Sequence, residues 1–288
     1  MIEEIADGVH VETAHLGSNN AILVTDDGVV LIDAPHRPTD AVAWRRRAEQ
    51  LGGIRYLIQT DHHIDHTMGS HFVPGTVVGH RLTREGLLHS FPDPGYIADL
   101  VAVIDPQGVP LMAGHRPRLP EITFTDEMDL HVGGRHLRLL SFSGHTPNTI
   151  GVLLPDERIL FSGDNVCSAS LPSFQEAFVD RWLASLDLID ALDFDVLVPG
   201  HGDITDHAFV PAFKAQMEEL VARVAAAREG GADEEQAAAD VRYADRIHGA
   251  TEHWEVGYPD SIVESLQVRS IRQIYQQVAA GRLTCAHG

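Results

Sequence analysis

The feature that most constrains this chain is a set of four short polar segments, each of which follows an expected β-strand and carries His or Asp. They span Thr60–His66, Ser143–Asn148, Ser162–Asn165 and Pro199–Asp203. Imidazole and carboxylate groups are the side chains that borderline divalent metals accept as ligands. A single Gly-His at a strand end is more often a turn with a hydrogen-bonded histidine. Four such segments together predict one metal site assembled from distant parts of the chain.

The segments lie within a repeating pattern of strands and helices. Two apolar runs, 21–25 and 28–33, flank Asp27-Gly28 and predict a hairpin, since Asp-Gly supplies the positive φ of a tight turn. Further strands are expected at 54–60, 76–79, 121–132, 135–142, 151–154, 158–162 and 196–199, and helices at 38–51 (N-cap Thr39 or Asp40), from Leu82 and at 181–192. The same order recurs in both halves of the chain, which indicates two similar layered halves that share one site rather than two independent domains.

Residues 91–120 are rich in Pro and Gly and show no clear periodicity, so they are expected to form a loop. A loop of this length inside a compact domain is uncommon unless it covers a site. We therefore interpret about 84–120 as a lid, with a plain surface excursion as the alternative.

The character of the chain changes after residue 205. Residues 211–229 and 233–246 are rich in Ala, Glu and Arg with helical apolar spacing. A last helix is expected to start at Ser261, where Ser261 and Glu264 have capping-box spacing, and to end near Gly281. This segment lacks ligand spacing, so 206–288 is interpreted as a helical extension. It would pack on the domain before it, form a homo-oligomer contact or contribute a pocket wall.

Charge and cysteine content limit the partners and the compartment. The 288 residues include 21 Lys and Arg against 42 Asp and Glu, a net charge of −21 at pH 7, so we expect no nucleic-acid partner. The two cysteines, Cys167 and Cys285, exclude a disulfide framework. Met1–Gly8 lacks a secretory-signal pattern, and no stretch approaches the roughly 18 apolar residues of a membrane helix. We expect a cytoplasmic protein that acts on a small molecule and does not span a membrane.

The order of the four polar segments resembles the metallo-β-lactamase fold superfamily. Its His-x-His-x-Asp-His signature is followed by a Gly-His, a Gly-Asp and a final Gly-His, and the match covers roughly residues 5–205. The resemblance implies an α/β fold, a four-layer αββα sandwich over residues 1–205 with its site at one edge between the sheets. The C-terminal helical extension would follow at 206–288.

By this resemblance, two divalent metal ions would bind to seven side chains: Asp61, His63, Asp65, His66, His145, Asp164 and His201. Asp164 would bridge the two metals. Asp61, His63 and His145 would hold the first ion, and Asp65, His66 and His201 the second.

Asp61 departs from the family pattern, because it occupies the position of the first histidine. Ligation by its carboxylate would make the site harder and shift its preference from zinc, the first expectation, toward manganese or iron. A second interpretation keeps one tightly bound metal, with Asp61 orienting a ligand. Ligation by His62 is the weakest alternative, because neighbouring residues at a strand end tend to point in opposite directions.

The resemblance implies a binuclear metal-dependent hydrolase that uses a metal-bound hydroxide on an ester-like bond such as a lactone or thioester. Asp65 would orient the water and move its proton. Two alternatives stay open: an iron-dependent redox member of the same fold, and a non-catalytic metal-binding member. Retention of the other ligand positions argues against the latter.

The sequence also offers candidates for the substrate pocket. Arg81, Arg84, Arg116 and Arg118 could contact an anionic substrate, although plain solvation explains them as well. Phe91–Tyr96 and His253–Tyr258 could line an apolar pocket, although core packing explains Trp254 and Tyr258 equally well. Among the histidines without ligand spacing, His36, His89 and His287 lie among polar or turn residues and are expected to be solvated.

Overall fold

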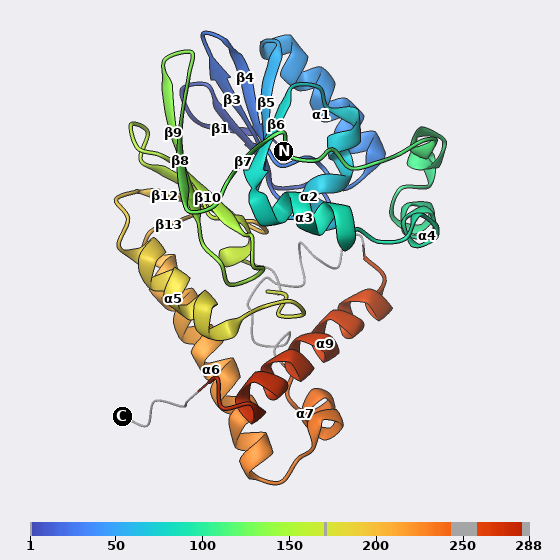
Figure 1. The fold of residues 1–288 in the computed structure, drawn as a ribbon, viewed down its shortest axis with the longest axis vertical. Coiled ribbons are helices and arrows are strands. Elements are labelled where there is room, and N and C mark those ends of the chain that lie inside the picture. The colour runs from blue at the N-terminus through green and yellow to red at the C-terminus, as the bar shows by residue number, and fades with distance from the viewer. Residues whose placement is uncertain (1, 170–171, 243–257, 284–288) are drawn as a thin grey trace.

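The computed structural model describes residues 2–169, 172–242 and 258–283, and shows two sheets packed face to face with helices on their outer sides (Figure 1). The first, seven-stranded sheet runs β1 (Glu3–Ala6), β2 (Val9–Glu12), β3 (Asn20–Thr25), β4 (Gly28–Ile32), β5 (Ile54–Gln59), β6 (Thr76–His80), β7 (Ile122–Phe124). The second, six-stranded sheet runs β13 (Thr205–Asp206), β12 (Val196–Val198), β11 (Ile159–Phe161), β10 (Ile150–Leu154), β9 (Arg135–Ser141), β8 (Glu127–Val132). The expected αββα sandwich is confirmed.

Strand residues alternate between two apolar layers, as the side-chain period of two requires. Leu57 of β5 packs on the outer side, in a cluster with Trp44 and Ala48 of α1 (Pro38–Leu51). Its neighbour Ile58 packs inward, in a cluster shared with Leu139 of the second sheet. The first sheet is therefore buried on both faces, which explains the continuous apolar runs in its sequence.

The strand expected at 121–132 is in fact two strands. β7 pairs in parallel with β6 of the first sheet, whereas β8 pairs with β9 of the second. The chain crosses from one sheet to the other between them. The N-cap expected in α1 is also wrong: Arg37 occupies that position and Pro38 begins the helix, while Thr39 donates its backbone N–H and its hydroxyl to Asp105.

The segment 91–120 is not the loop expected from its composition. It contains α4 (Pro94–Ile104) and the 3-10 helix η2 (Pro106–Met112). The Asp93 carboxylate caps α4 by accepting from Gly95 N at 2.7 Å, and Ile97, Val101 and Ile104 are buried. The helix packs on Leu16 and Met68, close to the polar segments. Its role as a lid stays a prediction.

The C-terminal extension is present as α6 (Phe209–Glu229), α7 (Glu234–Asp240) and α9 (Asp260–Ala279). These helices and α5 (Val179–Asp190) share one apolar cluster with the outer face of the second sheet. The capping box expected at Ser261 and Glu264 is wrong, because α9 begins at Asp260 and no side chain caps it. The domain boundary at 205 stays a prediction.

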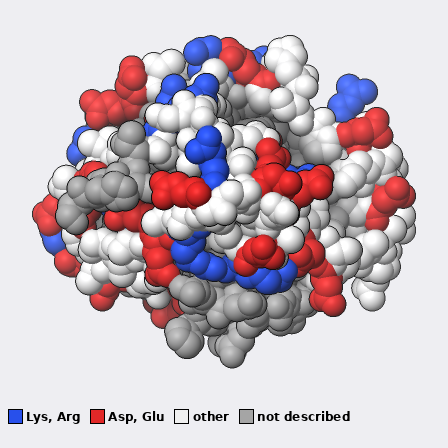
Figure 2. All heavy atoms as spheres, turned by 90° about the horizontal axis from the view of Figure 1, so that it is seen from below, with Lys and Arg blue, Asp and Glu red and all other residues white. Residues whose placement is uncertain are grey.

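The surface bears on the expected partners. On the face that carries the C-terminal helices, Figure 2 shows acidic and basic side chains interspersed, without a continuous basic stripe among the residues it colours. Within the described part of the chain, no helix has both the length and the apolar character needed to cross a bilayer.

Candidate metal centre

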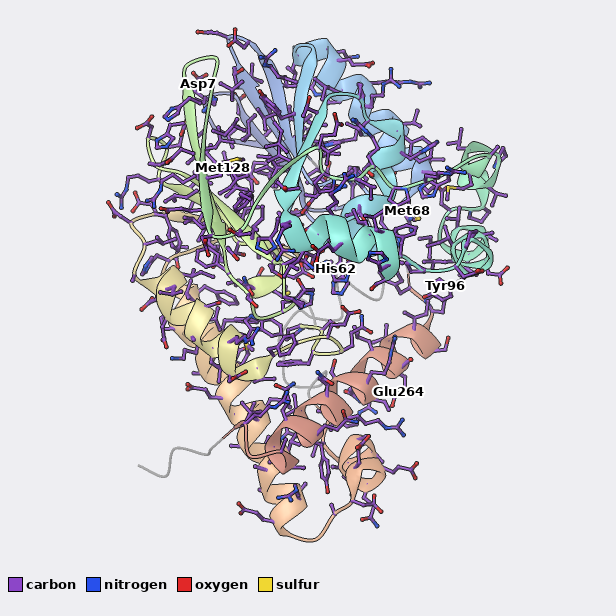
Figure 3. The ribbon with its side chains drawn as sticks, in the orientation of Figure 1. Asp7, His62, Met68, Tyr96, Met128 and Glu264 are labelled. Atoms are coloured by element: carbon purple, nitrogen blue, oxygen red, sulfur yellow. The ribbon has the colours of Figure 1, made fainter. Side chains whose placement is uncertain are left out.

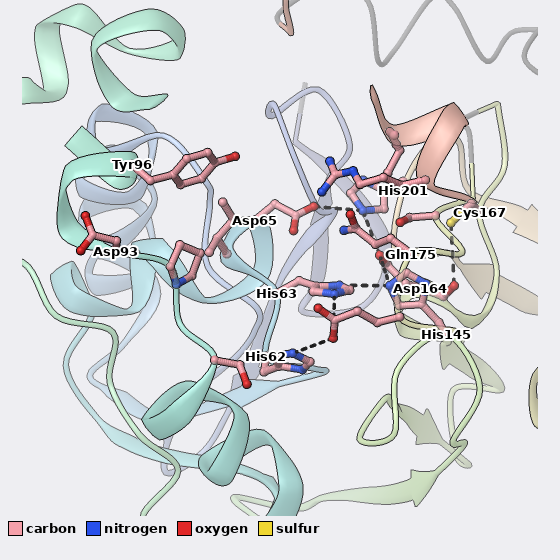
Figure 4. Close-up of a pocket in the computed structure, with 17 residues that line it drawn as sticks. His62, His63, Asp65, Asp93, Tyr96, His145, Asp164, Cys167, Gln175 and His201 are labelled. Atoms are coloured by element: carbon pink, nitrogen blue, oxygen red, sulfur yellow. Dashed lines mark hydrogen bonds and ion pairs between the residues drawn. The ribbon is translucent and has the colours of Figure 1, made fainter. Parts of the chain in front are cut away.

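The four polar segments converge at the edge between the two sheets that faces the C-terminal helices. One segment follows β5 and enters the short helix α2 (Ile64–Thr67), and another forms the 3-10 turn η3 (Gly163–Asn165) after β11. The remaining two follow β9 and β12. They line a cavity of about 400 Å³ (Figure 4), and Figure 3 places His62 at the end of the sandwich above α9.

The first cluster consists of Asp61, His63, His145 and Asp164, whose ligand-type atoms all lie within 4.8 Å of one another. His63 Nδ1 and His145 Nε2 are 3.1 Å apart. Asp61 Oδ2 lies 3.3 Å from His63 Nδ1 and 3.8 Å from His145 Nε2. The other oxygen, Asp61 Oδ1, accepts a hydrogen bond from His63 N at 2.8 Å, which fixes the turn and aims Oδ2 at the two imidazoles.

The second cluster consists of Asp65, His66 and His201. His201 Nε2 lies 3.2 Å from Asp65 Oδ2. Asp164 contacts both clusters: its Oδ1 is 3.1 Å from His66 Nε2, and its Oδ2 is 3.2 Å from His201 Nε2 and 3.3 Å from His145 Nε2. All seven side chains predicted from the sequence are therefore brought together, with Asp164 between the two groups.

The donor set fits divalent metal ions. Asp61 Oδ2, His66 Nε2 and Asp164 Oδ1 are buried, and although each lies 3.1–3.3 Å from an oppositely charged group, none of them makes a hydrogen bond of suitable geometry among the described residues. Buried polar atoms that lack well-formed hydrogen bonds are destabilising. Several such atoms at one point, all of types that zinc, manganese and iron accept, are accounted for by ions that those atoms would bind.

The metal-free site holds protons that an ion would displace. Burial lowers the pKa of His63, but the charge and hydrogen bond of Asp61, together with the charges of Asp65 and Glu176, outweigh burial and raise that pKa to about 9. For His201, the charges and hydrogen bonds of Asp164 and Asp65 together outweigh burial and raise the pKa to about 10. Burial prevails at His145 and lowers its pKa to about 4, so this imidazole is neutral at pH 7.

These shifts predict that metal binding becomes tighter as the pH rises from 7 toward 9. His63 and His201 hold a proton below their raised pKa values and must lose it to bind an ion, so binding at pH 7 should release protons. Titration of zinc into metal-free protein, in buffers of different ionisation enthalpy, measures that release. A zinc affinity that does not change over this range would contradict the assignment of these two histidines.

Asp33 is a residue of the site that the sequence interpretation missed. It follows β4 with a φ of 54°, and its Oδ2 accepts from His66 Nδ1 at 2.8 Å. Thr60 holds the same carboxylate through its backbone N–H and its hydroxyl, at 2.8 and 2.7 Å. Because Nδ1 donates to Asp33, the Nε2 of His66 is left as a ligand atom that points at Asp164.

His62 does not join either of the two clusters that meet at Asp164. Its Nδ1 accepts from Asn148 Nδ2 at 2.8 Å, and its Nε2 lies 3.2 Å from Glu176 Oε2. Thr83 and Thr146 donate to Asn148 Oδ1, which orients the amide. His62 therefore donates from Nε2 and holds Glu176 in the pocket wall, where His62, His63 and Glu176 form a third group of ligand-type atoms.

Other candidates from the sequence have different outcomes. The four arginines proposed for an anionic substrate do not line the pocket, and Arg269 of α9 does. Tyr96 lines it, and residues 253–257 lie outside the described part of the chain.

The histidines expected to be solvated differ from one another. His36 is buried, with its Nδ1 2.7 Å from the Tyr258 hydroxyl, whereas His89 is exposed and His287 is not described. Burial raises the pKa of the Cys167 thiol, which stays protonated.

Comparison with known proteins gives the family. The model of the metallo-beta-lactamase superfamily matches residues 15–201, and the chain belongs to this superfamily. The chain is 27% identical to thioesterase pkgB of Emericella nidulans over 189 residues, which are 65% of this chain and 46% of the relative. It spans at most half the length of the curated relatives it matches.

Two solved structures show the extent of the shared fold. A metallo-beta-lactamase from Pontibacter korlensis superimposes on this chain with a TM-score of 0.58 at 21% sequence identity. The superposition covers 76% of this chain and 98% of the lactamase chain. The sec-alkylsulfatase Pisa1 from Pseudomonas sp. has a TM-score of 0.62 at 15% identity and covers 96% of this chain and 50% of its own. The fold shared with the alkylsulfatase therefore extends over nearly all of this chain.

Proposed function

We propose that the protein is a binuclear metal-dependent hydrolase that cleaves an ester-like bond, such as a lactone or thioester, in a small molecule. The observation that carries this proposal is the position of Asp164, whose two carboxylate oxygens face histidines of both clusters. Asp61, His63 and His145 would hold one ion, and Asp65, His66 and His201 the other. Bound divalent ions lower the pKa of a water and polarise the oxygen under attack.

The chain's own residues would orient the reactants. Asp65 lines the pocket, and 18% of its side chain is exposed, so its carboxylate can accept a hydrogen bond from a water there and receive its proton. Gly17 O accepts from His201 Nδ1 at 2.9 Å, and Ser18 donates its hydroxyl to Asp65 O at 2.9 Å. The loop at 17–18 thus supports two residues of the second cluster at once.

Metal content and hydrolysis together test the proposal. After growth with zinc, manganese and iron, we expect two equivalents of metal per chain, and hydrolysis of 4-nitrophenyl acetate that chelation abolishes and metal restores. One equivalent would support the mononuclear alternative, and none would contradict a metalloenzyme. Oxygen consumption by the iron-loaded protein without ester hydrolysis would favour the redox alternative.

Replacing Asp61 by His tests whether its carboxylate is a ligand. We expect Asp61→His to keep two metals but to raise the zinc-to-manganese ratio bound in competition, because imidazole is a softer donor than carboxylate. Asp61→Asn is the matched control: it retains the oxygen that accepts from His63 N and loses only the charge. Unchanged metal content, metal preference and activity in Asp61→His would show that Asp61 is not a ligand.

A further inference from the structure

Helix α9 contributes a cation to the wall of the pocket. Leu266 and Arg269, one turn apart on α9, line the same cavity as Asp65 and His201. Leu266 is buried, whereas Arg269 is exposed. Among the described residues that line this cavity, Arg269 is the only one with a Lys or Arg side chain.

Arg269 is held in place by the anchoring of its helix. Ser270 Oγ accepts from Phe174 N at 3.0 Å, and Gln277 Oε1 accepts from Val179 N at 3.0 Å. Ile271 and Ile274 are fully buried in the cluster shared with the second sheet. The anchored segment, 173–179, also carries Glu176 into the pocket wall. The two sides of the pocket are therefore fixed to each other.

The guanidinium of Arg269 forms no ion pair with a residue that the structure describes. Within the described ranges no carboxylate lies within 4.0 Å of it, and its side chain makes one hydrogen bond, a long one of 3.3 Å from Nε to Ser265 O. Neighbouring arginines differ: Arg272 lies 3.9 Å from both Glu234 and Glu235, and Arg242 pairs with Glu264 through two bonds of 3.0 Å. Among the described residues, the two outer nitrogens of Arg269 therefore have no hydrogen-bond partner.

A planar guanidinium with free donors matches an oxyanion, which it can bind through two parallel hydrogen bonds. In a chain with a net charge of −21, long-range attraction does not bring an anion to this pocket. Recognition of one would depend on local cations, which are the metal centre and Arg269. The two lie on one cavity, so a single small molecule can reach both.

We propose that Arg269 binds a negatively charged group of the substrate. The substrate class would then be esters or thioesters that carry an anionic group, a carboxylate or a sulfonate, away from the scissile bond. This inference rests on the proposed hydrolase function. It makes α9 the element that selects the substrate.

The test compares three esters that differ in their terminal group. The 4-nitrophenyl half-ester of glutaric acid carries a free carboxylate where 4-nitrophenyl pentanoate ends in a methyl group, and the 4-sulfobutanoate ester carries a sulfonate. A charge-assisted hydrogen bond predicts a kcat/KM about tenfold to hundredfold higher for the anionic esters. Whichever anionic ester is preferred identifies the oxyanion.

Arg269→Ala should lower the anionic-to-neutral ratio of kcat/KM to near one, mainly through KM, and Arg269→Lys should keep part of it. Arg272→Ala is the matched control on the same helix, because its guanidinium faces Glu234 and Glu235, and it should keep the wild-type ratio. A ratio near one in the wild type, or a wild-type ratio in Arg269→Ala, would overturn the inference and leave the hydrolase proposal intact.

Absence of hydrolysis with all three esters would instead count against the hydrolase function. Binding then decides the role of Arg269 without turnover. Calorimetric titration of glutarate into the metal-loaded protein should give an affinity at least about tenfold higher in the wild type than in Arg269→Ala, with a smaller difference for pentanoate, in which a methyl group replaces one carboxylate. Equal affinities of the two proteins for glutarate would overturn the inference.

Discussion

Replacing Asp164 by Asn should remove at least one metal ion per chain and lower kcat/KM by more than about a hundredfold. Loss of a residue that only orients a ligand typically costs 10–100-fold in metal affinity or activity, and Asp164 faces histidines of both clusters directly. The amide has nearly the same shape but lacks the charge that would offset two divalent ions. Metal analysis and steady-state kinetics on ester substrates measure both effects.

The control for this change is Asp193→Asn, which removes one carboxylate from the surface, where 86% of the side chain is exposed. It should keep the metal content and the activity of the wild type. Circular dichroism of metal-free Asp164→Asn separates loss of metal from loss of fold. Two metals per chain and undiminished kcat/KM in a folded Asp164→Asn protein would refute the bridging role.

The strand ends and their polar segments could be predicted because their signals are local. β5 and β12 are short apolar runs, and each is followed at once by residues that cannot continue a buried strand. In parallel strands such as β4 and β5, or β11 and β12, the carboxyl ends meet at one edge of the sheet. The positions of the polar segments at strand ends therefore predicted that they meet, whereas the assignment of individual ligands came from the resemblance to the superfamily.

Helix α4 was missed although its start has a local signature. Asp93 at the N-cap and Pro94 in the first turn are typical of a helix start. The Pro and Gly content of the flanking residues obscured it, because composition over thirty residues averages a helix with the irregular chain on either side. A scan for caps rather than for composition would have predicted this helix.

Residues whose role depends on distant contacts could not be predicted. Asp33 contacts His66 across 33 positions, and His62 contacts Asn148 across 86. Arg269 has no ligand spacing within its helix, and only the packing of α9 brings it to the pocket. Such residues are found from tertiary contacts, because a carboxylate or guanidinium that reaches a site from another element has no spacing relative to the motif.

Replacing Trp182 by Ala should lower the free energy of unfolding by about 3–5 kcal/mol, the cost of a large-to-small change at a fully buried aromatic. Its ring lies 5.0 Å from that of Phe174 and 5.2 Å from that of His145, between centroids. Its indole Nε1 donates to Asn165 O at 2.9 Å, one residue beyond Asp164. Urea unfolding of the metal-free protein, followed by two spectroscopic probes, measures the change.

The same contacts link the core of the second sheet to the metal centre, so Trp182→Ala should also weaken zinc binding. Asn165 donates from its side chain to Phe142 O and accepts from His145 N, and Trp182 holds the backbone of Asn165. Trp182→Phe retains most of the ring and loses the indole hydrogen bond, so it separates packing from that bond. If Trp182→Ala proves destabilised but binds zinc with wild-type affinity, the ligands are held independently of this core. If the free energy of unfolding and the zinc affinity of Trp182→Ala fall together, and Trp182→Phe restores most of the stability, then packing of the ring against His145 keeps this metal ligand in position.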